Sequence, residues 1–152
     1  MRPRPGHTSA LFVCFLVMIL LAACKKKEPA PEPTPAAEPQ PVEVTGITLG
    51  SAIGPDRRVT EETAAFGPTD TIYVSVGTNG VSSGATLSAR WTYEDGQVVD
   101  ESSQTIAPNG PEVTEFHISK PDGWPVGKYQ VVISLDGAQS GAQEFEVTAG
   151  GG

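Results

Sequence analysis

The sequence has only two cysteines, Cys14 and Cys24, and none after position 24. This absence excludes an internal disulfide, a redox-active cysteine pair, a cysteine-based metal site and a thiol nucleophile from residues 25–152. A folded domain in this region must therefore be held together by its hydrophobic core alone.

Lysine and arginine are also scarce, since the chain has 10 of them against 18 Asp and Glu, for a formal net charge of −8. Binding to nucleic acid depends on clustered Lys and Arg that neutralise phosphates, so we expect no nucleic-acid partner. The acidic character favours solubility and repels anionic surfaces.

Histidine is nearly absent, and His117 is the only one beyond position 7. We expect His117 to be a solvated surface residue, because zinc needs three or four donors and residues 25–152 contain no second histidine and no cysteine. No phosphate-binding or dinucleotide-binding motif occurs, so the sequence predicts no cofactor and no metal. Three acidic pairs could offer calcium ligands, although none has EF-hand spacing: Glu61-Glu62, Glu94-Asp95 and Asp100-Glu101.

One short string matches a hydrolase motif. Gly80-Val81-Ser82-Ser83-Gly84 has the Gly-x-Ser-x-Gly pattern, in which a strained turn between a strand and a helix raises a nucleophilic serine. Here the flanking residues predict two strands, and His117 is the only histidine that could act as the base. We interpret the string as a flexible hairpin loop and keep hydrolysis by Ser82 as a remote alternative.

The chain starts with a short basic segment, containing Arg2 and Arg4, followed by an apolar run over residues 10–23. This order is typical of a secretory signal peptide, and the run is short for a membrane-spanning helix. Its end, Leu21-Ala22-Ala23-Cys24, resembles the lipobox of bacterial lipoproteins. The resemblance implies cleavage between Ala23 and Cys24, a diacylglyceryl group on the Cys24 sulfur and an acylated amino terminus. An uncleaved N-terminal helix that serves as the anchor is the alternative.

Residues 24–41 predict a tether between the lipid and a domain. Three lysines, at positions 25–27, would lie among lipid headgroups, where each contributes about 1 kcal/mol on an anionic surface, or would serve only solubility. The prolines of residues 28–41 exclude helix and sheet and favour an extended spacer, which reaches roughly 50 Å at about 3.1 Å per residue. A proline-rich ligand for a partner domain is the alternative.

The residue after the lipidated cysteine carries sorting information in enterobacterial lipoproteins, where an aspartate signals retention in the inner membrane. Lys25 stands in that place. By resemblance, we expect a lipid-anchored protein of the bacterial cell envelope, in the outer membrane and facing the periplasm. The inner membrane and the cell surface are the alternatives.

Residues 42–149 have the composition of an all-β domain, with Val, Ile, Thr, Tyr and Gly in short alternating runs between turn signals. Residues 56–68 are expected to be irregular and residues 150–152 to be a disordered tail. The pattern predicts seven strands, at residues 42–53 with a bulge at Gly46, 71–78, 86–93, 97–106, 113–119, 127–135 and 143–148.

About seven antiparallel strands in roughly 110 residues are the size and pattern of a single immunoglobulin-like β-sandwich. Trp91 followed by Asp95-Gly96 is similar to the core tryptophan of strand C and the turn after it. Gly127-Lys128-Tyr129-Gln130-Val131 is similar to the Gly-x-Tyr-x-Cys of strand F, with valine in place of cysteine. The resemblance implies that Trp91 and Tyr129 are core residues and that Tyr129 is a tyrosine-corner residue. The missing cysteine pair favours a bacterial Ig-like or fibronectin-like module over an antibody-type domain.

Two aromatic residues are candidates for contact with a partner. Trp124 lies in a Pro- and Gly-rich loop at one end of the predicted sandwich, where Ig-like domains bind partners. We favour its alternative role as a lid over the open end of the core. Tyr73, which the alternation of its strand places outward, is a weaker candidate.

These features together predict a membrane-anchored, non-catalytic binding or scaffolding module. Its expected partners are the membrane, through the N-terminal lipid, and another envelope protein or a glycan, through end loops or a sheet edge. A second hypothesis is an enzyme inhibitor or a periplasmic chaperone that acts by strand addition, which predicts a long uncovered edge strand.

Overall fold

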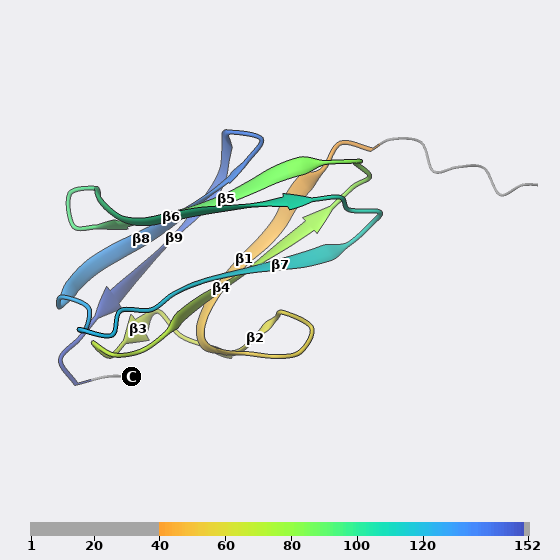
Figure 1. Ribbon diagram of the computed structural model, residues 1–152. Helices are drawn as coiled ribbons and strands as arrows, with labels where there is room; N and C mark the ends of the chain where they lie inside the picture. Colours follow the sequence, from red (N-terminus) through yellow and green to blue (C-terminus); the bar gives the residue numbers. More distant parts are fainter. Residues whose placement is uncertain (1–39, 151–152) are drawn as a thin grey trace, which may run out of the picture. The chain divides into compact units, whose positions relative to one another are not determined.

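The structure is a computed structural model, and it describes residues 40–150 of the chain. These residues form two β-sheets that pack face to face (Figure 1). No helix long and apolar enough to cross a membrane occurs within them. The strands are β1 (Glu43–Ile53), β2 (Val59–Glu62), β3 (Ala65–Phe66), β4 (Ile72–Asn79), β5 (Ala85–Tyr93), β6 (Gln97–Ile106), β7 (Glu112–Ile118), β8 (Gly127–Leu135) and β9 (Ala138–Val147).

The order of the strands is that of an immunoglobulin-like sandwich. One sheet has the order β2-β1-β4-β7 and the other the order β3-β9-β8-β5-β6. In the letters used for such domains, β1, β4 and β7 are strands A, B and E, while β9, β8, β5 and β6 are strands G, F, C and C′. The prediction of an all-β, Ig-like sandwich is therefore confirmed.

The region from residue 56 to residue 68 is more ordered than the sequence predicted. It contains β2, which pairs with the end of β1, and β3, which pairs in parallel with β9. The sandwich thus has nine strands where about seven were expected, and one of its pairings is parallel. β2 forms a local hairpin with the end of β1. β3 forms because of a partner distant in sequence, since Phe66 is fully buried and packs edge-on against Phe145 at 5.5 Å.

The first strand has the bulge that the sequence predicted, because the register between β1 and β4 shifts between Val44 and Gly46. The last strand is longer than predicted and starts at Ala138, directly after the tight turn at Asp136 and Gly137. The first six residues of β9 lack an alternating apolar pattern, so no hydrophobic signal marks them as a strand.

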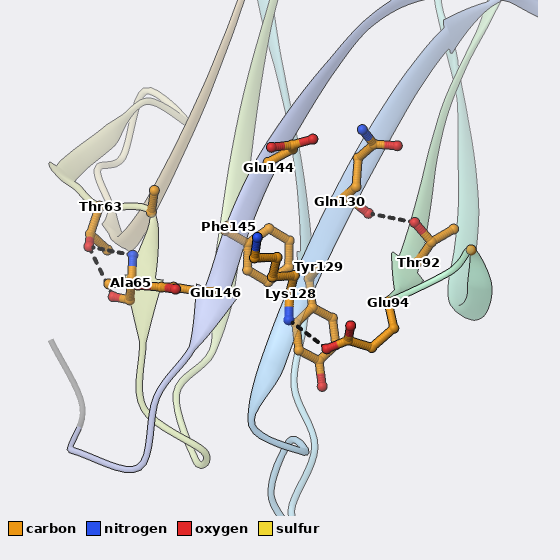
Figure 2. A pocket seen from close by; sticks show the side chains of 12 residues that line it. Thr63, Ala65, Thr92, Glu94, Lys128, Tyr129, Gln130, Glu144, Phe145 and Glu146 are labelled. Carbon is orange, nitrogen blue, oxygen red and sulfur yellow. Dashed lines mark hydrogen bonds between the residues drawn. The ribbon is translucent and has the colours of Figure 1, made fainter.

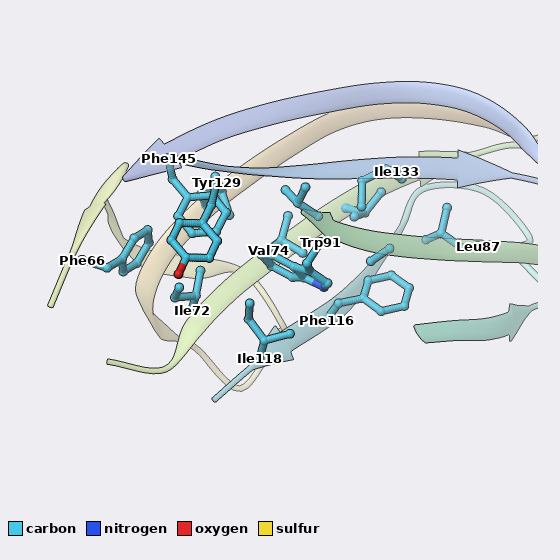
Figure 3. Packing of buried hydrophobic residues seen from close by; sticks show 14 of the residues in the cluster. Phe66, Ile72, Val74, Leu87, Trp91, Phe116, Ile118, Tyr129, Ile133 and Phe145 are labelled. Atoms are coloured by element: carbon cyan, nitrogen blue, oxygen red, sulfur yellow. The ribbon is translucent and has the colours of Figure 1, made fainter. Parts of the chain in front are cut away.

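The core lies between the sheets and is formed by the alternating apolar residues of both (Figure 3). Trp91 of β5 is fully buried at its centre, with its ring edge-on to Phe145 at 5.9 Å. Burial of a side chain of this kind contributes about 1.5–3 kcal/mol or more. The core is thereby continuous from Leu87 at one end of β5 to the aromatic cluster around Tyr129 at the other.

Candidate functional site

On one side of the sandwich, β6 and β7 form the open edges of the two sheets. β6 is the outer strand of the five-stranded sheet, and β7 is the outer strand of the four-stranded sheet. With ten residues, β6 is the longest edge strand, compared with two residues in β3, four in β2 and seven in β7. Most of its side chains are exposed.

The pairing pattern shows which backbone groups of β6 are free. The backbone N–H of Thr86 in β5 donates to the side-chain carboxylate of Asp136 at 2.7 Å, and the Thr86 carbonyl accepts from the backbone N–H of Asp136 at 2.8 Å. Both backbone groups of Thr86 therefore point toward the β8 side. Backbone groups alternate in direction along a strand, so Leu87, Ala89 and Trp91 bond to their β6 partners instead. The residues of β6 opposite the even-numbered β5 residues therefore direct their N–H and C=O groups outward, away from the sheet: Glu101, Ser103 and Thr105.

The edges of β6 and β7 are joined near Gln104 and are separated by a cleft near the start of β6. The side-chain amide of Gln104 donates a hydrogen bond to the backbone carbonyl of Glu115 at 2.7 Å, which bridges the two sheets. Toward the start of β6, Val99 has no partner in β5, so the strand is bulged there. A cleft of about 630 Å³ lies between the bulged part of β6, the end of β7 and the loop that follows it.

The cleft has an apolar floor and a polar rim. Tyr93, Val98 and Val99 line it from the β5–β6 hairpin, and Ile118 and Pro125 from the opposite side. Three titratable side chains lie on its rim: Asp100, His117 and Lys120. Among residues 40–150, the exposed large hydrophobic side chains are Val98 in the cleft and Val126, which follows the cleft residue Pro125.

The charge on this side of the domain is of one sign. The hairpin turn, β6 and β7 contain no lysine or arginine. They carry six carboxylates: Glu94, Asp95, Asp100, Glu101, Glu112 and Glu115. The nearest basic groups flank this region, with Arg90 at 3.8 Å from Glu101 and Lys120 beyond the end of β7.

Trp124 is positioned as a lid and not as an exposed binding residue. Only 7% of its surface is exposed, its indole N–H donates to the carbonyl of Asp70 at 3.1 Å, and its backbone N–H donates to Pro68 at 2.6 Å. A partner could reach only the edge of the ring, where it contributes to the cleft. The loop folds Trp124 inward onto Tyr129, which fits the lid role that we favoured over direct contact with a partner.

Tyr129 has the geometry of a tyrosine corner. Its hydroxyl donates to the carbonyl of Pro125, four residues upstream, at 2.8 Å. Its ring stacks on Phe145 at 5.2 Å and touches Tyr93 at 4.8 Å. Burial raises the pKa of Tyr129 to about 12, and the proximity of Tyr93 and Glu94 adds to the shift. Tyr129 and Tyr93, packed against each other, both line the cleft.

Tyr73, the weaker candidate, lies on the outer face of the four-stranded sheet. It pairs across strands with His117 of β7, and the two rings are 5.5 Å apart. His117 is exposed, and its Nδ1 lies 2.6 Å from the carboxylate of Glu115. Tyr73 is half-buried by this contact and is separated from the main cleft residues of β6 by the width of β7.

Ser82 and His117 do not come together. Ser82 lies beyond the end of β4, where its hydroxyl bonds to the carbonyl and the amide of Gly84 at 3.1 Å in a local turn. His117 is opposite Tyr73 at the start of β4. Six residue steps lie between Tyr73 and Asn79, and at about 3.3 Å per step they separate the two positions by about 20 Å. His117, the histidine present in residues 40–150, is therefore out of reach of Ser82.

A second hollow, of about 680 Å³, lies on the outer face of the five-stranded sheet (Figure 2). Its polar groups include three carboxylates and one amine, those of Glu94, Glu144, Glu146 and Lys128. Most of its lining residues in β5 and β8 belong to strands that are paired on both sides. No three His, Asp or Glu side chains converge to hold a metal ion anywhere in residues 40–150.

Some predicted site residues lie outside the described residues, namely Ala23 and Cys24 with their proposed cleavage and lipidation. Conversely, the sequence interpretation missed the free edge at Glu101, Ser103 and Thr105. The sequence does contain a signal for this edge. The side chains of β6 are mostly polar on both faces of the strand, whereas β4, β5 and β8 are apolar on one face. A strand that is polar on both faces belongs at the edge of a sheet.

No protein-family model matches the chain, and no curated protein matches it. Among solved structures, it is similar to an alkylpurine DNA glycosylase of Pseudomonas fluorescens bound to DNA that contains an abasic-site analogue (TM-score 0.49, 15% identity, 71% of this chain and 30% of that one). It is also similar to an immunoglobulin-like protein of Pseudomonas aeruginosa (TM-score 0.46, 14% identity, 71% and 97%). A third similar structure is the CARDB domain of a Pyrococcus furiosus protein in complex with di-metal ions (TM-score 0.44, 11% identity, 73% and 89%).

Proposed function

We propose that this chain is a lipid-anchored, non-catalytic binding module of the bacterial envelope, which contacts a partner through the β6 side of its Ig-like domain. The observation that supports binding at this side is the ten-residue open edge of β6 beside the 630 Å³ cleft. Free backbone donors and acceptors next to an apolar hollow can give affinity and specificity at once.

The proposed anchor rests on the sequence Leu21-Ala22-Ala23-Cys24 after an apolar run. In this proposal the lipid on Cys24 holds the chain in the membrane, since each buried methylene contributes about 0.8 kcal/mol and two or more acyl chains anchor stably. The proline-rich residues 28–41 then set the reach of the domain from the lipid surface. The proposed partner is another envelope protein or a glycan.

The anchor is tested with Cys24→Ser, for which Cys14→Ser is the matched control. We expect wild-type protein and Cys14→Ser to incorporate labelled palmitate and to fractionate with membranes. Cys24→Ser should lose the label and, once processed by another signal peptidase or truncated before residue 24, should become soluble. Globomycin should cause the precursor of the wild type to accumulate. Wild-type protein that never takes up palmitate would end the lipoprotein proposal.

A second candidate function, an enzyme inhibitor or a periplasmic chaperone, is favoured by the same edge strand. Both activities need a long uncovered strand, and β6 has the length for strand addition. The two candidates differ in what they recognise, since a chaperone binds many unfolded chains and a binding module binds one defined partner. Photo-crosslinking from Thr105 in intact cells identifies the chaperone by a broad distribution of adducts, whereas a binding module or an inhibitor gives one discrete adduct. An inhibitor is then recognised because the cross-linked partner is an enzyme whose activity falls when the purified domain is added.

A further inference from the structure

The open edge of β6 has an unusual kind of protection. Sheet edges are commonly guarded against pairing by lysine, proline, bulges or inward-pointing charges. β6 contains neither lysine nor proline, and its bulge at Val99 leaves the stretch from Asp100 to Ile106 in regular register with β5. The charges that guard this stretch are both acidic, Asp100 on the inner face opposite Trp91 and Glu101 on the outer face opposite Arg90.

We propose that β6 pairs with an extended, cationic segment of a partner protein, which adds a strand to the five-stranded sheet. This inference rests on the proposed binding function and specifies the partner's chemistry. The segment would bond to the outward backbone groups of Glu101, Ser103 and Thr105, which offer three donors and three acceptors. Its side chains would then alternate between the outer face and the cleft side.

Charge complementarity selects a cationic occupant. Adjacent strands are about 4.8 Å apart, which is shorter than the Debye length of about 8 Å at physiological salt, so charges on an added strand interact with those of β6. A lysine or arginine beside Asp100 or Glu101 forms an opposite-charge pair, and each such pair raises affinity about 1.5- to 5-fold. The six carboxylates of the hairpin turn, β6 and β7 extend this field over both faces of the edge.

A second copy of this chain fits less well. A symmetric pairing about Ser103 would place Glu101 opposite Thr105 of the other copy, which by itself is acceptable. However, residues 40–150 contain 15 acidic and five basic residues, so each copy brings a formal charge of −10 and six carboxylates to the contact. The acidic side chains at this edge therefore disfavour pairing with a second copy and favour pairing with a positively charged segment.

The apolar surroundings of the edge give the segment a place for one uncharged side chain. Val98 is 42% exposed and lines the cleft beside the first residues of β6, with Tyr93 and Ile118 at its base. A side chain of the added strand that points toward the cleft would cover Val98. Lys120 on the opposite rim disfavours a second cation in the cleft itself, which places the cationic positions nearer to Asp100 and Glu101.

The test uses the full chain in non-ionic detergent and capped nine-residue peptides as probes. One peptide has the sequence Thr-Lys-Thr-Lys-Val-Lys-Thr-Lys-Thr, a second replaces every Lys with Glu, and a third carries N-methyl groups on alternate residues of the Lys peptide. Hydrogen exchange at single-residue resolution reads out the amides of Glu101, Ser103 and Thr105. We expect the Lys peptide to protect these three amides and to bind at least ten-fold more tightly than the Glu peptide at 50 mM salt, with a smaller difference at 500 mM. The N-methylated peptide should not protect them.

Two variants separate backbone pairing from charge. Ser103→Pro removes an outward N–H without removing a bond to β5, and should weaken binding of the Lys peptide at least ten-fold. The charge variant D100N/E101Q should weaken it several-fold, while the matched control E61Q/E62Q on β2, which removes the same charge from the far edge, should not. Equal binding of the Lys and Glu peptides, equal effects of the two charge variants, or no protection of β6 at millimolar peptide would each overturn the proposal.

Other occupants have distinct outcomes. Concentration-dependent dimerisation that protects the same amides, without competition by the Lys peptide, would assign β6 to a second copy and overturn the inference. If the peptides fail while a photo-crosslinker at Thr105 still captures a discrete partner in cells, the binding function survives and the cationic-strand inference falls. If wild-type protein carries no lipid but binds the Lys peptide as described, the anchor falls and the β6 inference stands.

Discussion

The tyrosine corner gives a pH-dependent prediction that can be worked out from the structure. Tyr129→Phe removes a buried hydroxyl that donates to the carbonyl of Pro125 at 2.8 Å. A hydrogen bond of this kind contributes about 0.5–1.5 kcal/mol, and Pro125 is exposed, so water can take the place of the lost donor. We expect Tyr129→Phe to lower the free energy of unfolding by about 1 kcal/mol at pH 7, measured by urea denaturation.

The same difference should shrink at alkaline pH. The pKa of Tyr129 is raised to about 12 in the folded state, against the usual 10.0 of tyrosine, so the native state keeps its proton where the unfolded state has lost it. Such a group stabilises fully below pH 10 and loses that contribution as the pH rises toward 12. At pH 11 the loss is about 1.4 kcal/mol for the wild type and zero for Tyr129→Phe. The two unfolding free energies should therefore converge near pH 11.

Tyr93→Phe is the control for this experiment. The Tyr93 hydroxyl donates to the carbonyl of Val126 at 3.1 Å and is more exposed, so its removal should cost less at pH 7. It should also weaken the alkaline effect slightly, since the proximity of Tyr93 contributes to the raised pKa of Tyr129. A difference between wild type and Tyr129→Phe that is the same at pH 7 and pH 11 would refute this assignment of the shift.

Two further predictions concern the loop before β8. Trp124→Ala should lower the free energy of unfolding in urea by about 3–5 kcal/mol, because it empties a buried site and leaves the carbonyl of Asp70 without its donor. A decrease below about 1 kcal/mol would contradict the lid role. Gly127→Ala should lower the free energy of unfolding by about 1–3 kcal/mol, since Gly127 has a φ of 152° and a Cβ would meet the Glu94 carboxylate and the Tyr93 ring. The control Gly84→Ala, at an open position, should change it by less than about 0.5 kcal/mol.

The parts of the fold that the sequence predicted are those with local signals. Alternation of apolar residues located β4, β5 and β8, and the Gly-x-Tyr string located the start of β8. In contrast, β3 has only two residues and forms because Ala65 and Phe66 pair with Glu146 and Val147, about 80 positions away. No local pattern encodes a pairing of this kind, since its stabilisation is entirely tertiary.

The candidate site was less predictable for a related reason. The cleft exists because β6 bulges at Val99 while Gln104 ties the next part of the strand to β7. Neither the bulge nor the tie follows from the type of a single residue. Trp124 shows the same limit, since its sequence was compatible with an exposed contact or a lid, and only its hydrogen bond to Asp70 decides between them.

The four sheet edges differ in what prevents them from pairing with other chains. The strands β2 and β3 are too short to add a partner strand, and Gln104 occupies a backbone acceptor of β7. At β6 the protection is by acidic charge, and this charge acts in three ways in the proposed setting. It repels a second copy of a domain whose net charge is −10, it keeps the domain away from an anionic lipid surface, and it attracts a cationic segment. If the proposed anchor and the proposed partner are both correct, the edge of β6 stays unpaired at the membrane until a strand of opposite charge binds it.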